Sequence, residues 1–239
     1  MWGRSVNGLV LTFHLAGINN QNFLMRDDET GTYWQQISGR AISGPLTGQV
    51  LKLIHSDELT FALWKAEQPQ GVVLKEIAMY VPKYAPRDWE KKIDQEYAPV
   101  LSFPEHGLQS RDIMLTAEAF GEARAWRYEQ VRQAQLLRDH LGAESIVLVV
   151  GADGESVRAF RERIGGGDQP VEFFRTAEGS AIMMDSASGS RWNFQGCAIE
   201  GKLKGTCLEA LSVMKHFWFD WRNFHPETTV YTGEGLKRR

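Results

Sequence analysis

The sequence predicts a β-rich α+β protein made of two copies of one strand–turn–strand–helix module, related by a pseudo-twofold axis. The first observation behind this prediction is a repeated segment. Residues 39–51 return as residues 196–208, with seven of the thirteen positions identical. Average residue usage gives about one identity over that length. Matched glycines and matched tryptophans are the other two observations.

The offset between the two copies is nearly constant along the chain. Trp221 follows Trp64 by 157 positions. Upstream the offset is 158, and Asp185 matches Asp27. Six glycines fall at corresponding places, three in each copy: Gly39, Gly44, Gly48, Gly196, Gly201 and Gly205. Glycine inside a strand pattern marks a bulge or a sharp bend, so each copy is predicted to contain a bent strand–turn–strand unit.

The predicted domain organisation follows the repeat. We expect the first copy in residues 1–78, a linker in residues 79–110, and the second copy in residues 111–239. The linker is polar and carries four of the eight prolines of the chain. Asn7-Gly8 predicts a two-residue hairpin turn only seven residues from the start. The first copy is therefore predicted to be incomplete at its N-terminus.

Local patterns predict the individual elements. Residues 9–15 alternate and are rich in β-formers, and residues 146–151 form an apolar run typical of a buried strand. Each copy is predicted to enter a short helix, with Ser56 and Ser212 as the N-caps. Another short helix is expected at residues 156–164. Residues 123–141 have helical propensities but irregular apolar spacing.

Composition excludes some classes of function. The net charge of −3 gives no general attraction to nucleic acid, and no run of 18 apolar residues exists that would span a bilayer. The N-terminus lacks the layout of a signal peptide, and the compartment stays open. The two cysteines, Cys197 and Cys207, correspond to Arg40 and Val50, so the module does not require them. We expect free, buried thiols, with a disulfide as the alternative.

The motifs together resemble a known family. The acidic turn at residues 27–34, the glycine segment at 39–48 and the aromatic segment at 217–228 are similar to the bacterial and archaeal family catalogued as domain of unknown function 3179. The resemblance covers about residues 4–75 and 112–235. It implies no established activity, and it favours a strand–short helix–strand arrangement for residues 123–141.

Two departures from the family limit what the resemblance implies. Its members commonly carry a Cys-Pro-Leu-Cys segment before the strand that corresponds to residues 9–15, and this chain begins at about that point without it. The equivalent stretch of the second copy, residues 149–156, also has no cysteine. No metal or redox role is therefore carried over. Related proteins are often exported, but no export signal is found here.

The candidate site residues lie in the repeated acidic turns. Asp27 and Asp185 are candidate catalytic residues, because paired carboxylates serve hydrolysis when one is protonated and the other ionised. The alternative is that each aspartate caps its own turn. The candidate ligand-binding residues are the two aspartates with the hydroxyl and aromatic residues that follow them: Asp27, Thr32, Trp34, Asp185, Ser190 and Trp192. The tryptophans are either a stacking platform for a sugar or core residues.

No motif calls for a cofactor or a metal ion. The histidines lack metal-ligand spacing, and His216 with Asp220 is interpreted as a surface pair. Two functions are therefore weighed. The first is a non-catalytic binding or accessory protein, with an unknown small ligand or protein partner held where the two aspartate turns meet. The second is a hydrolase, possibly acting on glycans, that uses the paired aspartates. Whether the protein is an enzyme stays open.

Overall fold

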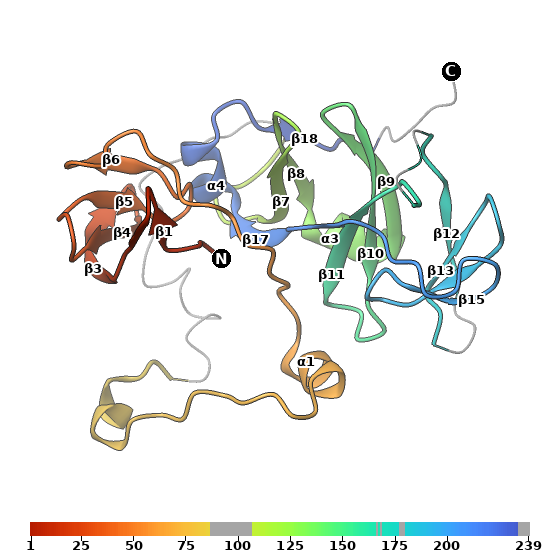
Figure 1. Ribbon diagram of the computed structural model, residues 1–239, viewed down its shortest axis with the longest axis horizontal. Helices are drawn as coiled ribbons and strands as arrows, with labels where there is room; N and C mark the ends of the chain where they lie inside the picture. The colour runs from red at the N-terminus through yellow and green to blue at the C-terminus, as the bar shows by residue number, and fades with distance from the viewer. Residues whose placement is uncertain (87–106, 166, 168, 177–179, 234–239) are drawn as a thin grey trace.

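The computed structural model describes residues 1–86, 107–165, 167, 169–176 and 180–233. The fold is β-rich, with several antiparallel sheets and few helices. Figure 1 shows the four-stranded sheets in a row, with the sheet of β3 to β6 at one end and the sheet of β12 to β15 at the other. The other two four-stranded sheets lie between them. The core is accordingly divided into several apolar clusters.

The chain begins with a hairpin of β1 (Ser5–Val6) and β2 (Leu9–Val10). Its turn places Asn7 and Gly8 at φ 50° and 81°, which confirms the predicted two-residue turn. The first four-stranded sheet follows, with β3 (Phe13–Asn19), β4 (Asn22–Asp27), β5 (Tyr33–Gln35) and β6 (Ala41–Ser43) in sequential order. The strand predicted at residues 9–15 is therefore split between β2 and β3.

The two central sheets are built from residues far apart in sequence. One has the order β17-β7-β8-β18, with β7 (Ile113–Ala119), β8 (Glu122–Arg127), β17 (Met214–Phe217) and β18 (Thr229–Val230). The other has the order β16-β11-β10-β9, with β9 (Leu136–Leu141), β10 (Glu144–Val150), β11 (Val157–Arg161) and β16 (Ala210–Leu211). The helix α3 (Tyr128–Ala134) joins β8 to β9. The strand–helix–strand arrangement expected for residues 123–141 is thus confirmed.

The helix predicted at residues 156–164 is wrong. This segment is β11, which pairs with β10 along its whole length, with Val147 opposite Phe160. Val157 and Ala159 pack into one apolar cluster, whereas Phe160 packs into another on the opposite face. Residues 157–160 of this strand are buried on both faces, so alternation does not mark an exposed face, and pairing with β10 decides the conformation.

The fourth sheet contains β12 (Phe173–Arg175), β13 (Met183–Asp185), β14 (Arg191–Trp192) and β15 (Ala198–Glu200). Cys197 and Cys207 face each other across an isolated antiparallel bridge and form a disulfide. The expectation of free thiols is therefore wrong. Arg40 and Val50 form the same kind of bridge, so the backbone brings these two positions together whether or not they are cysteines.

Two short α-helices follow the outer sheets: α1 (Phe61–Glu67) and α4 (Trp218–Phe224). The predicted N-caps are wrong. The N-cap of α1 is Thr60, whose hydroxyl accepts from the Leu63 amide, and the N-cap of α4 is Phe217. Both helices begin later than predicted: α1 starts at Phe61, and α4 starts at Trp218, directly after β17. The 3-10 helix η1 (Ala78–Lys83) comes next along the chain after α1.

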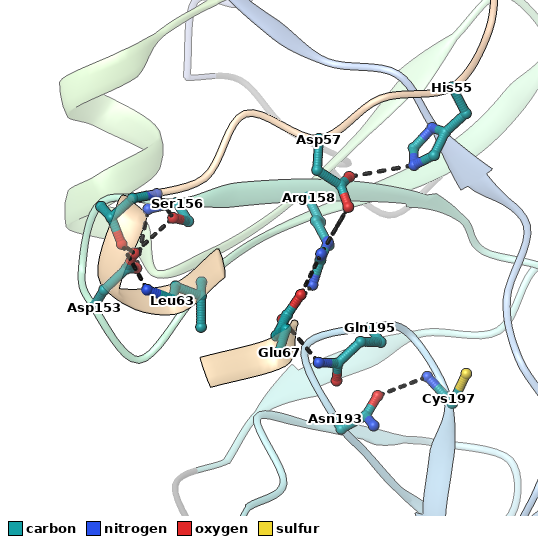
Figure 2. Close-up of polar contacts among 11 residues, drawn as sticks. His55, Asp57, Leu63, Glu67, Asp153, Ser156, Arg158, Asn193, Gln195 and Cys197 are labelled. Carbon is teal, nitrogen blue, oxygen red and sulfur yellow. Dashed lines mark hydrogen bonds and ion pairs between the residues drawn. The ribbon is translucent and has the colours of Figure 1, made fainter. Parts of the chain in front are cut away.

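The structure does not decide where the predicted domain boundaries lie. Most of the predicted linker, residues 87–106, lies outside the described residues. The helix α1, which belongs to the predicted first copy, lies against β11, which belongs to the second (Figure 2). The division into residues 1–78, 79–110 and 111–239 therefore remains a prediction.

Candidate functional site

The first predicted site residue, Asp27, is buried at the end of β4 and bonds to its own turn. Its carboxylate accepts hydrogen bonds from the Thr30 amide at 2.6 Å and from the Trp34 indole Nε1 at 2.7 Å. Burial raises the pKa of Asp27, but the hydrogen bonds from Trp34, Thr30 and Gly31 outweigh it and hold the pKa below its usual range. The group is therefore an ionised acceptor.

Asp185 has the same surroundings at the end of β13. Its carboxylate accepts from the Ser188 amide at 2.6 Å, from the Ser188 hydroxyl at 2.9 Å and from the Trp192 indole Nε1 at 2.9 Å. Burial again raises the pKa, and these hydrogen bonds again lower it by more. Both aspartates thus hold a turn and a buried tryptophan.

The hydroxyl and aromatic candidates also bond or pack close to their own turns. Thr32 and Ser190 are fully buried, and their hydroxyl oxygens accept from the amides of Leu46 at 3.2 Å and Leu203 at 3.1 Å. Trp34 and Trp192 are fully buried in apolar clusters. Glycine is required opposite each hydroxyl residue: a Cβ on Gly44 or Gly201 would lie 2.7 Å from the Cα of Thr32 or Ser190.

The structure does not bring the two aspartate turns together. Asp27 lies in the sheet of β3 to β6 and Asp185 in the sheet of β12 to β15, at opposite ends of the row of sheets in Figure 1. The expected cleft where both turns meet is therefore absent from the described part of the chain. The six candidate residues form two separate turns, each satisfied by its own neighbours.

A different site lies between the N-terminal segment and the sheet of β7. A cavity of about 160 Å³ is lined on one side by Trp2, Gln36, Ile37 and Leu53 and on the other by residues of β7, β17 and α4. We call it the imidazole cavity, because the facing side includes His216 from β17 and His225, the residue that ends α4.

Three aromatic rings are in contact at this cavity. The Trp221 ring is stacked on the His225 imidazole, with ring centroids 3.6 Å apart, and it is tilted by 36° against the His216 imidazole, with centroids 5.2 Å apart. The indole Nε1 of Trp221 donates to the Thr228 hydroxyl at 2.8 Å, which fixes the indole ring. The strand pairing of β17 with β7 places His216 opposite Met114 and brings it beside Thr116.

His216 is held in its neutral form. Its burial, together with the charge of His225, lowers its pKa to about 4. Its Nδ1 lies 2.8 Å from the Thr116 hydroxyl oxygen, and that hydroxyl donates to the Met214 carbonyl oxygen at 3.3 Å. Of the two neutral tautomers, the one with its hydrogen on Nδ1 donates to Thr116 and leaves a lone pair on Nε2. No described side chain donates to Nε2.

His225 is paired more fully. Its Nδ1 lies 3.2 Å from the Trp221 carbonyl oxygen, and its Nε2 lies 3.3 Å from a Glu118 carboxylate oxygen. Burial lowers the pKa of His225, although the Trp221 carbonyl and Glu118 act in the opposite direction. The predicted surface pair of His216 with Asp220 is wrong: Asp220 instead accepts from the Asn22 side-chain amide at 3.1 and 3.2 Å.

A second cavity, of about 340 Å³, lies beside α1. It is lined by Asp57, Leu59, Trp64, Glu67, Gln68 and Arg158. We call it the arginine cavity. Figure 2 shows the Arg158 guanidinium between the carboxylates of Asp57 and Glu67, with contacts of 2.7 to 2.8 Å to each. The carboxylates of Asp57 and Glu67 thus compensate the positive charge of the buried Arg158 side chain.

Sequence reasoning missed both cavities. Thr116 and His216 are 100 residues apart, and they meet only because β17 pairs with β7. One signal was present in the repeat: Trp64 and Trp221, which line the two cavities, are matched at the offset of 157. No cluster of three or more metal-ligating side chains occurs among the described residues, and no helix in that part of the chain is long and apolar enough to cross a membrane.

Comparison with known proteins places the chain in a family. Residues 1–228 match the family described as "Protein of unknown function (DUF3179)". The chain belongs to this family. No curated protein and no solved structure matches it. The resemblance found from the turns and the aromatic segment is thereby confirmed at the level of the family, and the DUF3179 description carries no activity to assign to either cavity.

Proposed function

We propose that the protein is a non-catalytic ligand-binding protein, built from two copies of one module, which holds a small molecule in the imidazole cavity. The observation that carries the proposal is that no described side chain bonds to Nε2 of His216, which faces a cavity that is otherwise largely apolar. Binding sites of this kind combine an apolar lining with a few polar groups that orient the ligand.

The duplication is supported by contacts that recur at the offset of 157 or 158. Each aspartate turn makes the same carboxylate–amide and carboxylate–indole bonds. Five residues of the arginine cavity, moved by 157 positions, become Met214, His216, Trp221, Phe224 and His225, and four of these line the imidazole cavity. The two cavities are thus interpreted as equivalent places in two copies.

The packing of the helices supports a pseudo-twofold relation. Leu63 of α1 and Phe194 belong to one apolar cluster, whereas Ile37 packs with Trp221 of α4 in another. Phe194 follows Ile37 by 157 positions. The helix of each proposed copy therefore packs against the same position, Phe194 or Ile37, of the other copy. In an experimental structure, residues 23–74 should superpose on residues 181–231. A different strand order in the two segments would refute the duplication.

The size and chemistry of the imidazole cavity define the ligand. A cavity of about 150 Å³ admits a molecule of the size of benzene. The Nε2 lone pair of His216 favours a ligand with one hydrogen-bond donor, and an unsatisfied donor or acceptor in such a site lowers affinity. We therefore expect a small ring-sized molecule with a hydroxyl or amine hydrogen.

The alternative of a hydrolase that uses Asp27 and Asp185 lacks such support. Hydrolysis by a carboxylate pair needs one protonated acid and a separation of about 5–10 Å between the carboxyl groups. Both pKa values are instead lowered, and the two turns lie in different sheets.

Phenol and benzene make a matched pair of probes for the proposal, because they differ only in the donor. Calorimetric titration should show phenol binding about tenfold more tightly than benzene, since one hydrogen bond is gained. Leu53→Trp, at the wall of the cavity, should abolish binding. Leu15→Trp, on an exposed strand position away from the cavity, is the control and should bind as the wild type. Equal binding by both variants would refute the proposal.

A further inference from the structure

A third cavity, of about 460 Å³, opens between β9 and β12. Its walls come from the end of α3, from these two strands and from the residues that follow β18. Figure 1 shows β9 and β12 next to each other at the end of the molecule opposite the first sheet. We call it the β12 cavity, because β12 contributes Arg175, the side chain on which the following argument rests.

The lining of the β12 cavity is mostly apolar and its charged groups are positive. Leu136 and Leu137 contribute from β9, and Phe173 and Phe174 contribute from β12. Among the described residues that line it, the charged side chains are two arginines and no carboxylate. A cavity of about 150 Å³ admits benzene, so the β12 cavity has room for a ring with a side chain of several atoms.

The first of these arginines, Arg138, already has its counter-charges. Its Nε and Nη2 donate to the two carboxylate oxygens of Glu162, and its Nη1 lies 3.1 Å from a carboxylate oxygen of Glu172. Glu162 is fully buried behind this pair. Arg138 is therefore committed to the fold, and it offers a ligand no unpaired charge.

The second arginine, Arg175, has only neutral partners. Its Nη1 donates to the Val150 carbonyl oxygen at 2.6 Å, and its Nη2 donates to the Gln135 side-chain oxygen at 3.3 Å. A guanidinium has five N–H groups, so these two bonds leave three N–H groups without an acceptor among the described residues. The positive charge of Arg175 is likewise not compensated by any carboxylate in that part of the chain.

The pKa values of the two arginines reflect this difference. Burial acts to lower the pKa of Arg138, but the bonds from Glu162 and Glu172 outweigh it, and the pKa is raised. At Arg175 burial is the sole cause of a shift, and the pKa is lowered. A guanidinium stays charged at neutral pH even so. Arg175 is thus a partly buried cation that lacks an anion.

The pairing of β12 with β13 does not itself call for an arginine. Arg175 lies opposite Met183 in that pair, and Leu15 lies opposite Met25 in the pair of β3 with β4. Both strands place a phenylalanine two residues earlier, opposite the aspartate of the turn. The first sheet therefore has the same pairing with an uncharged, 64% exposed leucine at this position.

We propose that the β12 cavity binds an organic carboxylate with an apolar body, whose carboxylate accepts hydrogen bonds from the Arg175 guanidinium and whose body lies against the leucines and phenylalanines of β9 and β12. The planar fork of a guanidinium matches the two oxygens of a carboxylate, and such bonds are stronger than neutral ones. The apolar lining favours a ligand whose remaining atoms are not charged. This site lies apart from the imidazole cavity and does not depend on its ligand.

Three probes separate the charge from the apolar body: 3-phenylpropionate, its neutral amide 3-phenylpropanamide, and acetate. Calorimetric titration of the full chain should show 3-phenylpropionate binding about tenfold or more tightly than the amide, because the amide cannot form the charge-assisted pair with Arg175. Acetate keeps the charge but has no ring to bury, so it should also bind at least about tenfold more weakly.

Two substitutions in the cavity and one control locate the site. Arg175→Met should weaken 3-phenylpropionate binding about tenfold or more. Ala134→Trp keeps Arg175 and its bonds to Val150 and Gln135, and it should also weaken binding because it fills the cavity from the end of α3. Gln133→Trp changes the neighbouring exposed residue, which is outside the lining, and should bind as the wild type.

Equal affinity for the acid and the amide would overturn the inference, and so would wild-type binding by Ala134→Trp. The remaining rival is a carboxylate of the chain itself, since Glu178 and Glu234 are near Arg175 and Gly233 in sequence and lie outside the described residues. Binding of 3-phenylpropionate only after Glu178→Gln and Glu234→Gln would identify that rival as the occupant. Leu53→Trp should leave this binding unchanged, so phenol reports separately on the proposed function.

Discussion

The two halves of the molecule are alike in their aspartate turns and different in the cavities beside their helices. Asp27 and Asp185 make nearly the same bonds to turn amides and to an indole. In the arginine cavity, the Arg158 guanidinium is paired with the carboxylates of Asp57 and Glu67. The imidazole cavity is instead lined by the neutral ring of His216. The two turns are thus alike in their bonding, and the proposal of a ligand site rests on the difference between the cavities.

The largest effect is expected at the tryptophans of the turns. Trp34→Ala and Trp192→Ala should each lower the free energy of unfolding by roughly 3–5 kcal/mol, since each removes a fully buried ring and leaves an aspartate without its indole donor. Urea denaturation measures both. Trp64→Ala, at a partly exposed ring on α1, is the control and should cost less. Unequal losses at Trp34 and Trp192 would break the equivalence of the turns.

The arginine cavity should respond to loss of its cation. Arg158→Met leaves Asp57 and Glu67 facing each other without a counter-charge, which should cost about 3 kcal/mol. Arg191→Met removes a more exposed arginine and should cost little, because surface pairs contribute about 0–1 kcal/mol. Chemical denaturation compares the two. An Arg158→Met protein as stable as the wild type would show that the pair does not hold α1 in place.

Of the two matched isolated bridges, the one at Cys197 and Cys207 carries a disulfide. Reduction of Cys197–Cys207, or the pair Cys197→Ala and Cys207→Ala, should cost about 2–3 kcal/mol, the loop entropy expected for a ten-residue separation. The fold should persist, because Arg40 and Val50 form the same bridge without sulfur. Thermal unfolding with and without reductant gives the difference. Complete unfolding on reduction would contradict the equivalence of the two bridges.

A smaller effect is expected in the dependence of stability on pH. The folded pKa of His216 is about 4, below its ordinary value, so the unfolded chain binds that proton first on acidification. Its contribution to stability is therefore lost as the pH falls from about 6.5 to 4. Burial raises the pKa of Asp220 to about 6, so the folded state binds that proton first, and its contribution grows as the pH falls from about 6 to 3.8.

The two effects oppose each other in the wild type. Asp220→Asn removes one of them, so the loss of stability between pH 6 and 4 should become steeper, by less than ~1.4 kcal/mol per pH unit. Asp28→Asn, at an exposed carboxylate, is the control. Denaturation at several pH values decides, and an unchanged slope in Asp220→Asn would show that Asp220 is ionised throughout this range.

The sequence predicted the features that depend on neighbouring residues. The Asn7-Gly8 turn, the strand at β10 and the short helices before Pro69 and Pro226 are set by local backbone preference or by apolar runs. The segment of β11 was mistaken for a helix, because its pairing with β10 overrides local propensity. The disulfide also depends on a contact that no spacing rule identifies.

The candidate site could not be predicted in the same way. The aspartate turns were found because they repeat, and each carboxylate bonds the amides of its own turn. The imidazole cavity joins Trp2, Thr116 and His216, and it forms only after β17 pairs with β7. The pKa of His216 is lowered because the ring is buried. The residues around His216 in the sequence are of mixed polarity, so they do not indicate this burial.

The most direct test of the central claim is a nitrogen NMR titration of the histidine rings, assigned with a His216→Gln variant. The account predicts a neutral His216 ring at pH 7, with Nε2 unprotonated, that stays neutral down to about pH 4. Addition of phenol should move its Nε2 resonance, and the exposed His14 and His140 should not respond. A His216 ring that titrates near pH 6.5 and does not respond to phenol would contradict the account.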